Sequence, residues 1–286
     1  MYSYLQSRED GLPTRLSGPW ALTKLDYLKR YIEVFETSMR RRWPNRNYVD
    51  ILAGPGKIQV RDAGTIYLGS PLLALTTEYP FTGYFLVDAD QRNTSALQSR
   101  CNTSNLADRV HIYTGDCNVV VDEIVAILKQ KEGESLNLAF LDPEGLELEW
   151  QTVAKLASIR KMDLVINYPE GGLNRMMSRA INSPDETLVD RYFGTWAWRD
   201  IYKEWQIHRE RSVHGRLIDL YREQLHQLGY IEVRRDDEVG DEPLMRNAQR
   251  RAPLYRLLFA SKHPLGDKFW HAITRRDVWG QGRLFE

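Results

Sequence analysis

The stretch Tyr48-Val49-Asp50-Ile51-Leu52-Ala53-Gly54-Pro55-Gly56 decides the fold of this chain. Its first five residues form a short apolar run with one acid, which is typical of a strand buried on both faces of a parallel sheet. The two glycines after it allow a tight turn and a close approach of the backbone to a ligand. The turn is neither a Walker loop, which ends in Gly-Lys-Ser/Thr, nor the six-residue dinucleotide fingerprint.

Outward from this stretch, short apolar runs alternate with helical patterns. An amphipathic helix over 21–43 comes first, and the expected strands after 48–52 are 83–87, 109–113, 136–141 and 162–166. Helical patterns lie between and beside them at 71–77, 94–101, 119–131 and 150–159. This alternation indicates βαβ units and a parallel sheet. Two late strands, 230–233 and 254–260, have no helix between them and suggest an antiparallel member at the sheet edge; a last helix follows over about 266–275.

These patterns divide the chain into four parts. Residues 1–20 are expected to be an irregular arm, and 21–169 the N-terminal part of a Rossmann-like cofactor-binding domain. Residues 170–211 interrupt the rhythm with tryptophans and charges and predict a helical insertion after strand five. Residues 212–286 complete the same domain. The predicted fold class is α/β, with a sheet of about seven mostly parallel strands.

Composition excludes several functional classes. The 286 residues hold 39 basic and 39 acidic side chains, so the chain has no basic excess of the kind that a polybasic nucleic-acid binder shows. Two cysteines exclude a disulfide framework and a four-cysteine zinc site, and indicate a cytoplasmic protein. The six histidines show no ligand spacing, so no metal is expected. No apolar run is long enough for a membrane span or a signal peptide.

Acids follow four successive predicted strands at their carboxyl ends, where ligands bind in open α/β sheets. Asp50 can accept hydrogen bonds from an amino group, and Asp88 from ribose hydroxyls. Asp116 is placed to meet an adenine amino group, and Asp142 lies where the reacting centre is expected. A glycine turn with a ribose-binding acid suits a nicotinamide cofactor or S-adenosylmethionine. Asp50 favours S-adenosylmethionine, because a carboxylate there would repel a dinucleotide pyrophosphate.

With these motifs in place, the chain resembles the three-Cys-motif partner (TcmP) family of bacterial proteins. The resemblance spans roughly residues 22 to 272. It rests on Lys24-Leu25-x-x-Leu28-x-x-Tyr31, on 48–56 as quoted, and on Leu68-Gly69-Ser70-Pro71, Leu86-Val87-Asp88-Ala89-Asp90, Ala139-Phe140-Leu141-Asp142-Pro143-Glu144-Gly145, Asp163-Leu164-Val165-Ile166-Asn167-Tyr168-Pro169 and Leu257-Leu258-Phe259-Ala260-Ser261-Lys262-His263-Pro264-Leu265-Gly266. It implies a Rossmann-like class I methyltransferase sheet, S-adenosylmethionine as cofactor, and a three-cysteine partner protein encoded nearby that resembles radical enzymes.

The resemblance also assigns roles by position. Asp50 and the turn Ala53-Gly54-Pro55-Gly56 would cradle the methionine end of the cofactor, Asp88-Ala89 the ribose, and Asp116-Cys117 the adenine. Asp142-Pro143 resembles the start of the Asp-Pro-Pro-Tyr motif of amino-group methyltransferases, in which the acid and a following carbonyl hold the target amine. Glu144 and Gly145 replace its last two residues, so the stacking ring must come from elsewhere, with Trp150 and Tyr168 as candidates.

Two functional hypotheses remain open. The first is a methyltransferase that acts on a nucleic acid or a small amine, with Asp142 as the orienting acceptor. The second is a non-catalytic module that binds the cofactor or the partner. The basic clusters Arg40-Arg41-Arg42-Trp43 and Arg246, Arg250, Arg251 are either solvated faces or a phosphate-contacting rim for nucleic acid. The oligomeric state is not fixed by the sequence.

Overall fold

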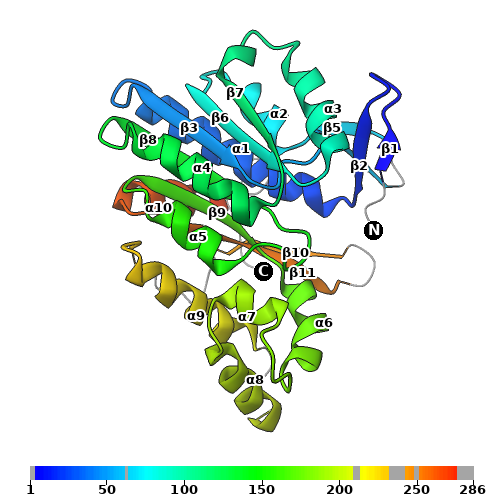
Figure 1. Cartoon of the computed structure of the whole chain (residues 1–286), viewed down its shortest axis with the longest axis vertical. Coiled ribbons are helices and arrows are strands. Elements are labelled where there is room, and N and C mark those ends of the chain that lie inside the picture. The colour runs from blue at the N-terminus through cyan, green and yellow to red at the C-terminus, as the bar shows by residue number, and fades with distance from the viewer. Residues whose placement is uncertain (1–3, 62–63, 209–212, 232–241, 248–250, 276–286) are drawn as a thin grey trace.

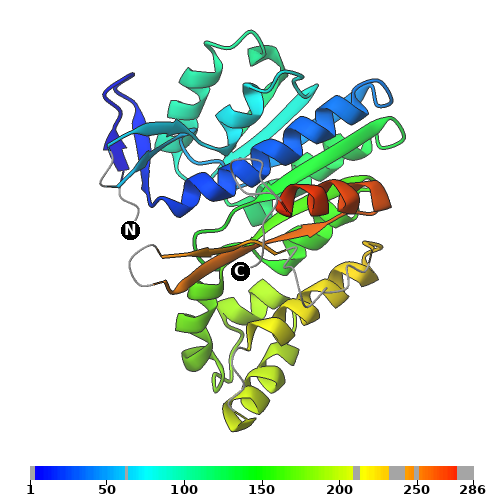
Figure 2. The ribbon, with the colours of Figure 1, turned by 180° about the vertical axis from the view of Figure 1, so that it is seen from behind.

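A computed structural model describes residues 4–61, 64–208, 213–231, 242–247 and 251–275. Two sheets organise them, one of seven strands and one of four. Helices cover both faces of the larger sheet (Figures 1 and 2), as expected for a sheet built from βαβ units. In the described part of the chain, no helix is both long and apolar enough to cross a membrane.

The seven-stranded sheet has the order β10-β11-β9-β8-β3-β6-β7. Neighbouring strands are parallel except for β11, which is antiparallel to both β9 and β10. This arrangement confirms the predicted Rossmann-like class I methyltransferase sheet. Its strands are β3 Asn45–Asp50, β6 Gly83–Asp88, β7 Val110–Thr114, β8 Ser135–Leu141, β9 Met162–Tyr168, β10 Leu244–Arg246 and β11 Pro253–Ala260.

One of the two late strands differs from the expectation. Tyr230 and Ile231 are not in a strand, and residues 232 and 233 lie outside the described residues. The antiparallel partner of β11 is β10, which is shorter than the other strands and follows the charged segment. A three-residue edge strand of this kind has too little periodicity to stand out in the sequence.

Alternate residues of each strand face two different helical layers. Tyr48 of β3 packs with one core cluster, and Val49 with the other. The first layer comprises α1 Trp20–Met39, α2 Ser70–Leu75, α3 Gln91–Cys101 and α10 Pro264–Thr274. The second comprises α4 Cys117–Lys129, α5 Trp150–Ala157 and α9 His214–Gln227. A short 3₁₀ helix, Ala107–Arg109, precedes β7.

Residues 1–20 are not an irregular arm where the structure describes them. They contain β1 Tyr4–Gln6 and β2 Pro13–Ser17, which join β4 Lys57–Val60 and β5 Ile66–Leu68 in the order β1-β2-β4-β5. Parallel pairing of β2 with β4 brings this segment to the strand directly after the glycine turn. Such long-range pairing leaves little local signal in a short segment rich in glycine and proline.

The expected insertion is helical, with α6 Glu170–Ala180, α7 Leu188–Phe193 and α8 Ala197–His208. At its centre, Asp190 accepts hydrogen bonds from Trp198 Nε1 at 2.9 Å and from Arg199 at 2.7 Å. All three side chains are buried. A charge pair with this many hydrogen bonds is tolerated in a core. The insertion lies beyond the sheet (Figure 1), and its apolar side chains join the core cluster of the second helical layer.

The topology also fixes where a ligand is expected. From β3 the chain moves to β6 and β7 on one side, then returns to place β8 on the other side of β3. The strand order therefore reverses between β3 and β8. Open α/β sheets bind ligands outside the carboxyl ends of the strands at this reversal.

Candidate functional site

Two adjoining cavities open at the carboxyl edge of the sheet. The first, here called the acidic cavity, has a volume of about 370 Å³ and is lined by Asp88, Ala89, Asp116, Cys117 and Asp142 among others. The second, called the loop cavity, has a volume of about 300 Å³ and is lined by 53–56, Asp142 and Pro143 among others. Four residues line both cavities: Arg15, Leu52, Asp142 and Glu144. The structure thus brings ten of the eleven predicted site residues to one place.

The glycine turn adopts the backbone that the sequence predicts. Gly54 and Gly56 have φ angles of +63° and +88°, in the left-handed region that disfavours other residues. A Cβ atom on Gly56 would lie 2.9 Å from Leu97 Cδ1, so that position is fixed by packing. At Gly54 the nearest atom to such a Cβ is Arg15 Nη1 at 3.8 Å, so this glycine leaves its backbone open toward the loop cavity.

Asp88 ties the glycine turn to the end of β6. Its carboxylate accepts hydrogen bonds from Gly54 N at 3.0 Å, Asp90 N at 2.8 Å and Asn93 Nδ2 at 3.0 Å. Oδ1 takes two of these donors and Oδ2 takes one. Since each carboxylate oxygen has about two acceptor sites, Oδ2 retains one toward the acidic cavity. Asp88 therefore both shapes the turn and can accept a bond from a ligand hydroxyl.

Asp116 and Cys117 begin α4 on the far wall of the acidic cavity. Asp116 caps the helix by accepting a hydrogen bond from Asn118 N at 2.9 Å, and its side chain is otherwise exposed. Cys117 is buried, and this burial raises the pKa of its thiol to about 12. A thiol that stays protonated at neutral pH lines a wall and does not act as a nucleophile.

Asp50 lies beneath the glycine turn and lines neither cavity. It is fully buried and accepts hydrogen bonds from Tyr48 Oη at 3.2 Å, Leu52 N at 3.3 Å and the Ser70 side chain. Burial raises its pKa to about 7. Ser70 does line the loop cavity, so a ligand there meets this hydroxyl and not the carboxylate itself.

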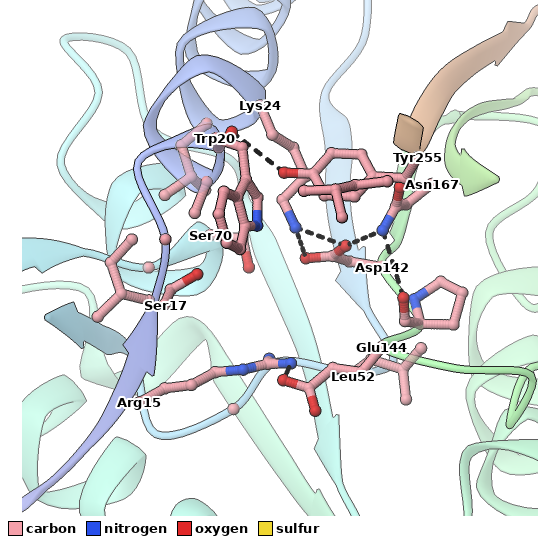
Figure 3. Close-up of a pocket in the computed structure, with 18 of the residues that line it drawn as sticks. Arg15, Ser17, Trp20, Lys24, Leu52, Ser70, Asp142, Glu144, Asn167 and Tyr255 are labelled. Carbon is pink, nitrogen blue, oxygen red and sulfur yellow. Dashed lines mark hydrogen bonds and ion pairs between the residues drawn. The ribbon is translucent and has the colours of Figure 1, made fainter. Parts of the chain in front are cut away.

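Asp142 is held at the boundary of the two cavities by two side chains that reach it from opposite sides (Figure 3). Lys24 Nζ of α1 donates to both carboxylate oxygens, at 2.7 and 2.5 Å, and Asn167 Nδ2 of β9 donates to Oδ1 at 2.7 Å. The side chains of Lys24 and Asp142 are only 12% and 14% exposed. Burial lowers the pKa of Lys24, and the charge of Asp142 opposes that change.

A second ion pair, between Arg15 of β2 and Glu144, stands at the same boundary (Figure 3). Both residues line both cavities, so an elongated ligand that spans the cavities must pass this pair. The N-terminal segment is itself fastened to the glycine turn by Arg100. The guanidinium group of Arg100 donates to Pro55 O at 2.5 Å, Pro13 O at 2.9 Å and the carboxylate of Asp10 at 3.0 Å.

The aromatic rings at the loop cavity are not those expected from the sequence. Tyr168 is fully buried and contacts His214 Nδ1 through its hydroxyl at 3.0 Å, while Trp150 packs edge-on against Tyr221. Neither lines a cavity. Trp20 and Tyr255 do line the loop cavity, where Tyr255 Oη donates to Trp20 O at 3.1 Å. These rings come from α1 and the antiparallel β11.

Four site residues were missed by sequence reasoning. Lys24 and Asn167 belong to the sequence stretches on which the family resemblance rests, but the resemblance assigned no role to either residue. Arg15 gave no signal, because its segment was expected to be irregular. Tyr255 begins a strand far along the chain, and only the antiparallel pairing of β11 with β9 brings it to this edge.

The basic cluster Arg40–Trp43 lies away from this site. Arg42 and Trp43 line a third cavity of about 440 Å³, together with Leu136 and Met162 at the amino ends of β8 and β9. That position is the opposite edge of the sheet, so this cluster cannot form a rim around the two cavities. Arg246 and Arg251 flank β10 and the start of β11 and lie nearer the carboxyl edge, and Arg250 lies outside the described residues. Exposed cations that line the loop cavity itself are Arg61 and Arg175.

No protein-family model and no curated protein matches the sequence. Among solved structures, a Legionella pneumophila protein assigned to the family DUF519 is 13% identical to this chain, with a TM-score of 0.41. The match covers 57% of this chain and 74% of that chain. A Methanococcus maripaludis protein, provisionally described as an S-adenosylmethionine-dependent methyltransferase, is 12% identical, with 84% and 89% covered and a TM-score of 0.32. Both likenesses are distant, and we base the function on the site geometry.

Within the described residues, no group of three or more histidine, cysteine, aspartate or glutamate side chains is arranged to hold a metal ion. The site instead offers hydrogen-bond acceptors, one buried ammonium group and open backbone at the glycine turn. These groups suit an organic ligand with hydroxyl and amino donors and a negative charge.

Proposed function

We propose that this protein binds S-adenosylmethionine across the acidic and loop cavities and transfers its methyl group to an amine. The observation that carries this proposal is the meeting of both cavities at Asp142, beside the reversal of strand order. S-adenosylmethionine consists of a nucleoside and an amino-acid tail. The acidic cavity would hold the nucleoside, and the loop cavity would hold the amino-acid tail.

The site residues fit this cofactor. Asp88 has a free acceptor site for a ribose hydroxyl, and Asp116 is exposed at the wall where an adenine amino group would lie. The open backbone at Gly54 admits a close-fitting tail. Asp50 supports this turn from below through Leu52 N and Ser70.

The bound cofactor supplies an electrophilic methyl group on a sulfonium. Methyl transfer would form a carbon–nitrogen bond and break the carbon–sulfur bond, leaving a thioether, and the methylated nitrogen would release its proton to solvent as the product leaves. No enzyme nucleophile is needed, which agrees with the protonated thiols of Cys101 and Cys117. Asp142 and the carbonyl of Pro143 would orient the amine, and Trp20 and Tyr255 would exclude water from the reacting atoms.

The alternative is a module that binds the cofactor without catalysis. Two observations favour it. Gly145 replaces the stacking aromatic of the amine-methylating motif, and the Arg15–Glu144 pair stands between the cavities. Incubation with methyl-labelled cofactor separates the two functions, because only the enzyme transfers label to RNA, DNA or small amines from cell extract.

A three-cysteine-motif protein is the partner that we propose for either function. The support on this chain is the helical insertion, which exposes large apolar side chains: Leu188 at 40%, Trp196 at 48% and Ile207 at 74%. Co-purification of the two proteins, with loss of the complex on Ile207→Asp, tests this. Survival of the complex in that variant would move the interface elsewhere.

A further inference from the structure

The loop cavity is lined by a largely buried pair of opposite charges, Lys24 and Asp142. Lys24 Nζ contacts both oxygens of Asp142, and neither side chain is more than 14% exposed. A buried ion pair costs desolvation energy that its own attraction only partly repays. A pair that lines a cavity can recover this cost when a ligand with one negative and one positive group binds to it.

A second observation at the same place calls for a hydrogen-bond donor. Asn167 is 4% exposed, and its Nδ2 donates to Asp142 Oδ1 at 2.7 Å and to Pro143 O at 3.3 Å. Its Oδ1 is buried and has no hydrogen-bond partner among the residues that the structure describes. An unpaired buried acceptor is energetically unfavourable, because it has lost its hydrogen bonds to water without gaining others. Since Asn167 lines the loop cavity, a ligand donor can satisfy this oxygen.

Resting on the function proposed above, we infer that Lys24 and Asn167 form the subsite for the amino-acid end of the cofactor. The ammonium group of Lys24 binds the carboxylate of that end. Asn167 Oδ1, together with Asp142, accepts hydrogen bonds from its α-ammonium group. The two charges of the ligand are thus matched in sign by groups that already lie in contact on the wall of the cavity.

This assignment also accounts for Asp50. The sequence assigned the amino group of the methionine end to Asp50, yet that carboxylate is fully buried and its contacts are Tyr48, Leu52 N and Ser70. Asp142 and Asn167 are the acceptors that line the loop cavity. When Lys24 turns to the ligand carboxylate, Asp142 loses a donor and regains an acceptor site for the amine to be methylated.

The test compares two ligands that differ only at the amino-acid end. S-adenosylhomocysteine has that end, and 5′-methylthioadenosine lacks it but retains the adenosine and the sulfur. Isothermal titration measures both affinities for wild type and for Lys24→Met. We expect Lys24→Met to weaken S-adenosylhomocysteine about 10- to 100-fold, the loss of a charge-assisted contact, and to leave 5′-methylthioadenosine within about threefold.

Further variants refine the result. Lys24→Arg should restore much of the affinity for S-adenosylhomocysteine, and Asn167→Ala should lower that affinity about tenfold without affecting the shorter ligand. Lys29→Met is the matched control, because Lys29 lies on the same helix with its side chain 56% exposed. The two ligands are compared within one variant, so an effect of Lys24→Met on stability does not enter their ratio.

Two results overturn the inference. If Lys24→Met weakens both ligands equally, or neither, the amino-acid end lies elsewhere while the proposed function stands. If wild type binds neither ligand, the proposed function and this subsite fail together.

Discussion

The two edges of the large sheet both carry cavities, and the comparison between them shows what marks a site in this fold. The amino-edge cavity is the largest of the three described above, at about 440 Å³, and its walls are mostly apolar, with Phe35, Met39 and Phe269 among them. The carboxyl-edge cavities are smaller, at about 370 and 300 Å³. They contain the glycine turn, side chains from four strand ends and the unsatisfied Asn167 Oδ1.

Size alone would select the amino edge, whereas the site that we propose lies at the carboxyl edge. A cavity between helices and the amino ends of strands forms wherever side chains do not fill the space. Polar groups gather at the carboxyl edge because all the parallel strands end there. Each edge also has a buried aspartate that belongs to a strand, Asp50 at the end of β3 and Asp163 near the start of β9. These two acids allow the comparison to be tested with matched substitutions.

The largest effect is expected from Asp88→Ala. The substitution removes an acceptor for the ribose and releases Gly54 N, so S-adenosylmethionine should bind at least about 100-fold more weakly. Isothermal titration measures the loss. Asp163→Asn at the amino edge is the control and should bind as wild type does. Equal affinity of Asp88→Ala and wild type would remove Asp88 from the site.

The next effect concerns stability against pH. Burial raises the pKa of Asp50 to about 7 and that of Asp163 to about 6, from 3.8. Between pH 4 and the raised values, the folded state binds more protons than the unfolded chain, so the free energy of unfolding falls as pH rises. Each acid contributes up to about 1.4 kcal/mol per pH unit. Urea unfolding at pH 5 and pH 7 measures the slope.

Asp50→Asn and Asp163→Asn should each flatten this pH dependence, because an amide does not titrate. Only Asp50→Asn should also weaken cofactor binding, by about tenfold, since Asp50 supports the glycine turn and Asp163 lies at the other edge. If Asp163→Asn lowers the affinity for the cofactor as much as Asp50→Asn does, the two edges do not differ in their contribution to binding.

The smallest effect is expected from Glu144→Ala. Glu144 and Arg15 are 37% and 22% exposed, so their pair contributes at most about 1 kcal/mol. Removing the acid opens the boundary between the cavities, and S-adenosylmethionine should bind up to about fivefold more tightly. Titration over several salt concentrations checks this. A loss of affinity would instead make Glu144 a ligand contact.

Much of the fold was predictable because buried parallel strands leave continuous apolar runs. The strands that end at Asp50, at Asp88 and directly before Asp142 were recognised from such runs, and their common edge followed from the parallel direction of the strands. The strand expected at 230–233 shows the limit, since the short β10 took the role assigned to it.

The site was less predictable, because side-chain partners depend on packing that one sequence does not encode locally. Ser70 is the first residue of α2, where no side-chain cap forms, and its hydroxyl bonds to Asp50 instead. Lys24 had the right periodicity for a helix, but only the docking of α1 against β8 and β9 gives it Asp142 as a partner. Arg15 depended on a strand pairing across more than forty residues.

The attachment of Arg100 has a practical consequence for handling this protein. One guanidinium group joins Asp10 and Pro13 of the leading segment to Pro55 of the glycine turn. Shortening the chain from its beginning, or fusing a bulky tag there, would therefore act on the ligand pocket itself. A loss of binding in such a preparation would report damage to the cavity wall, so the titrations need a chain in which Asp10 and Pro13 keep their contacts with Arg100.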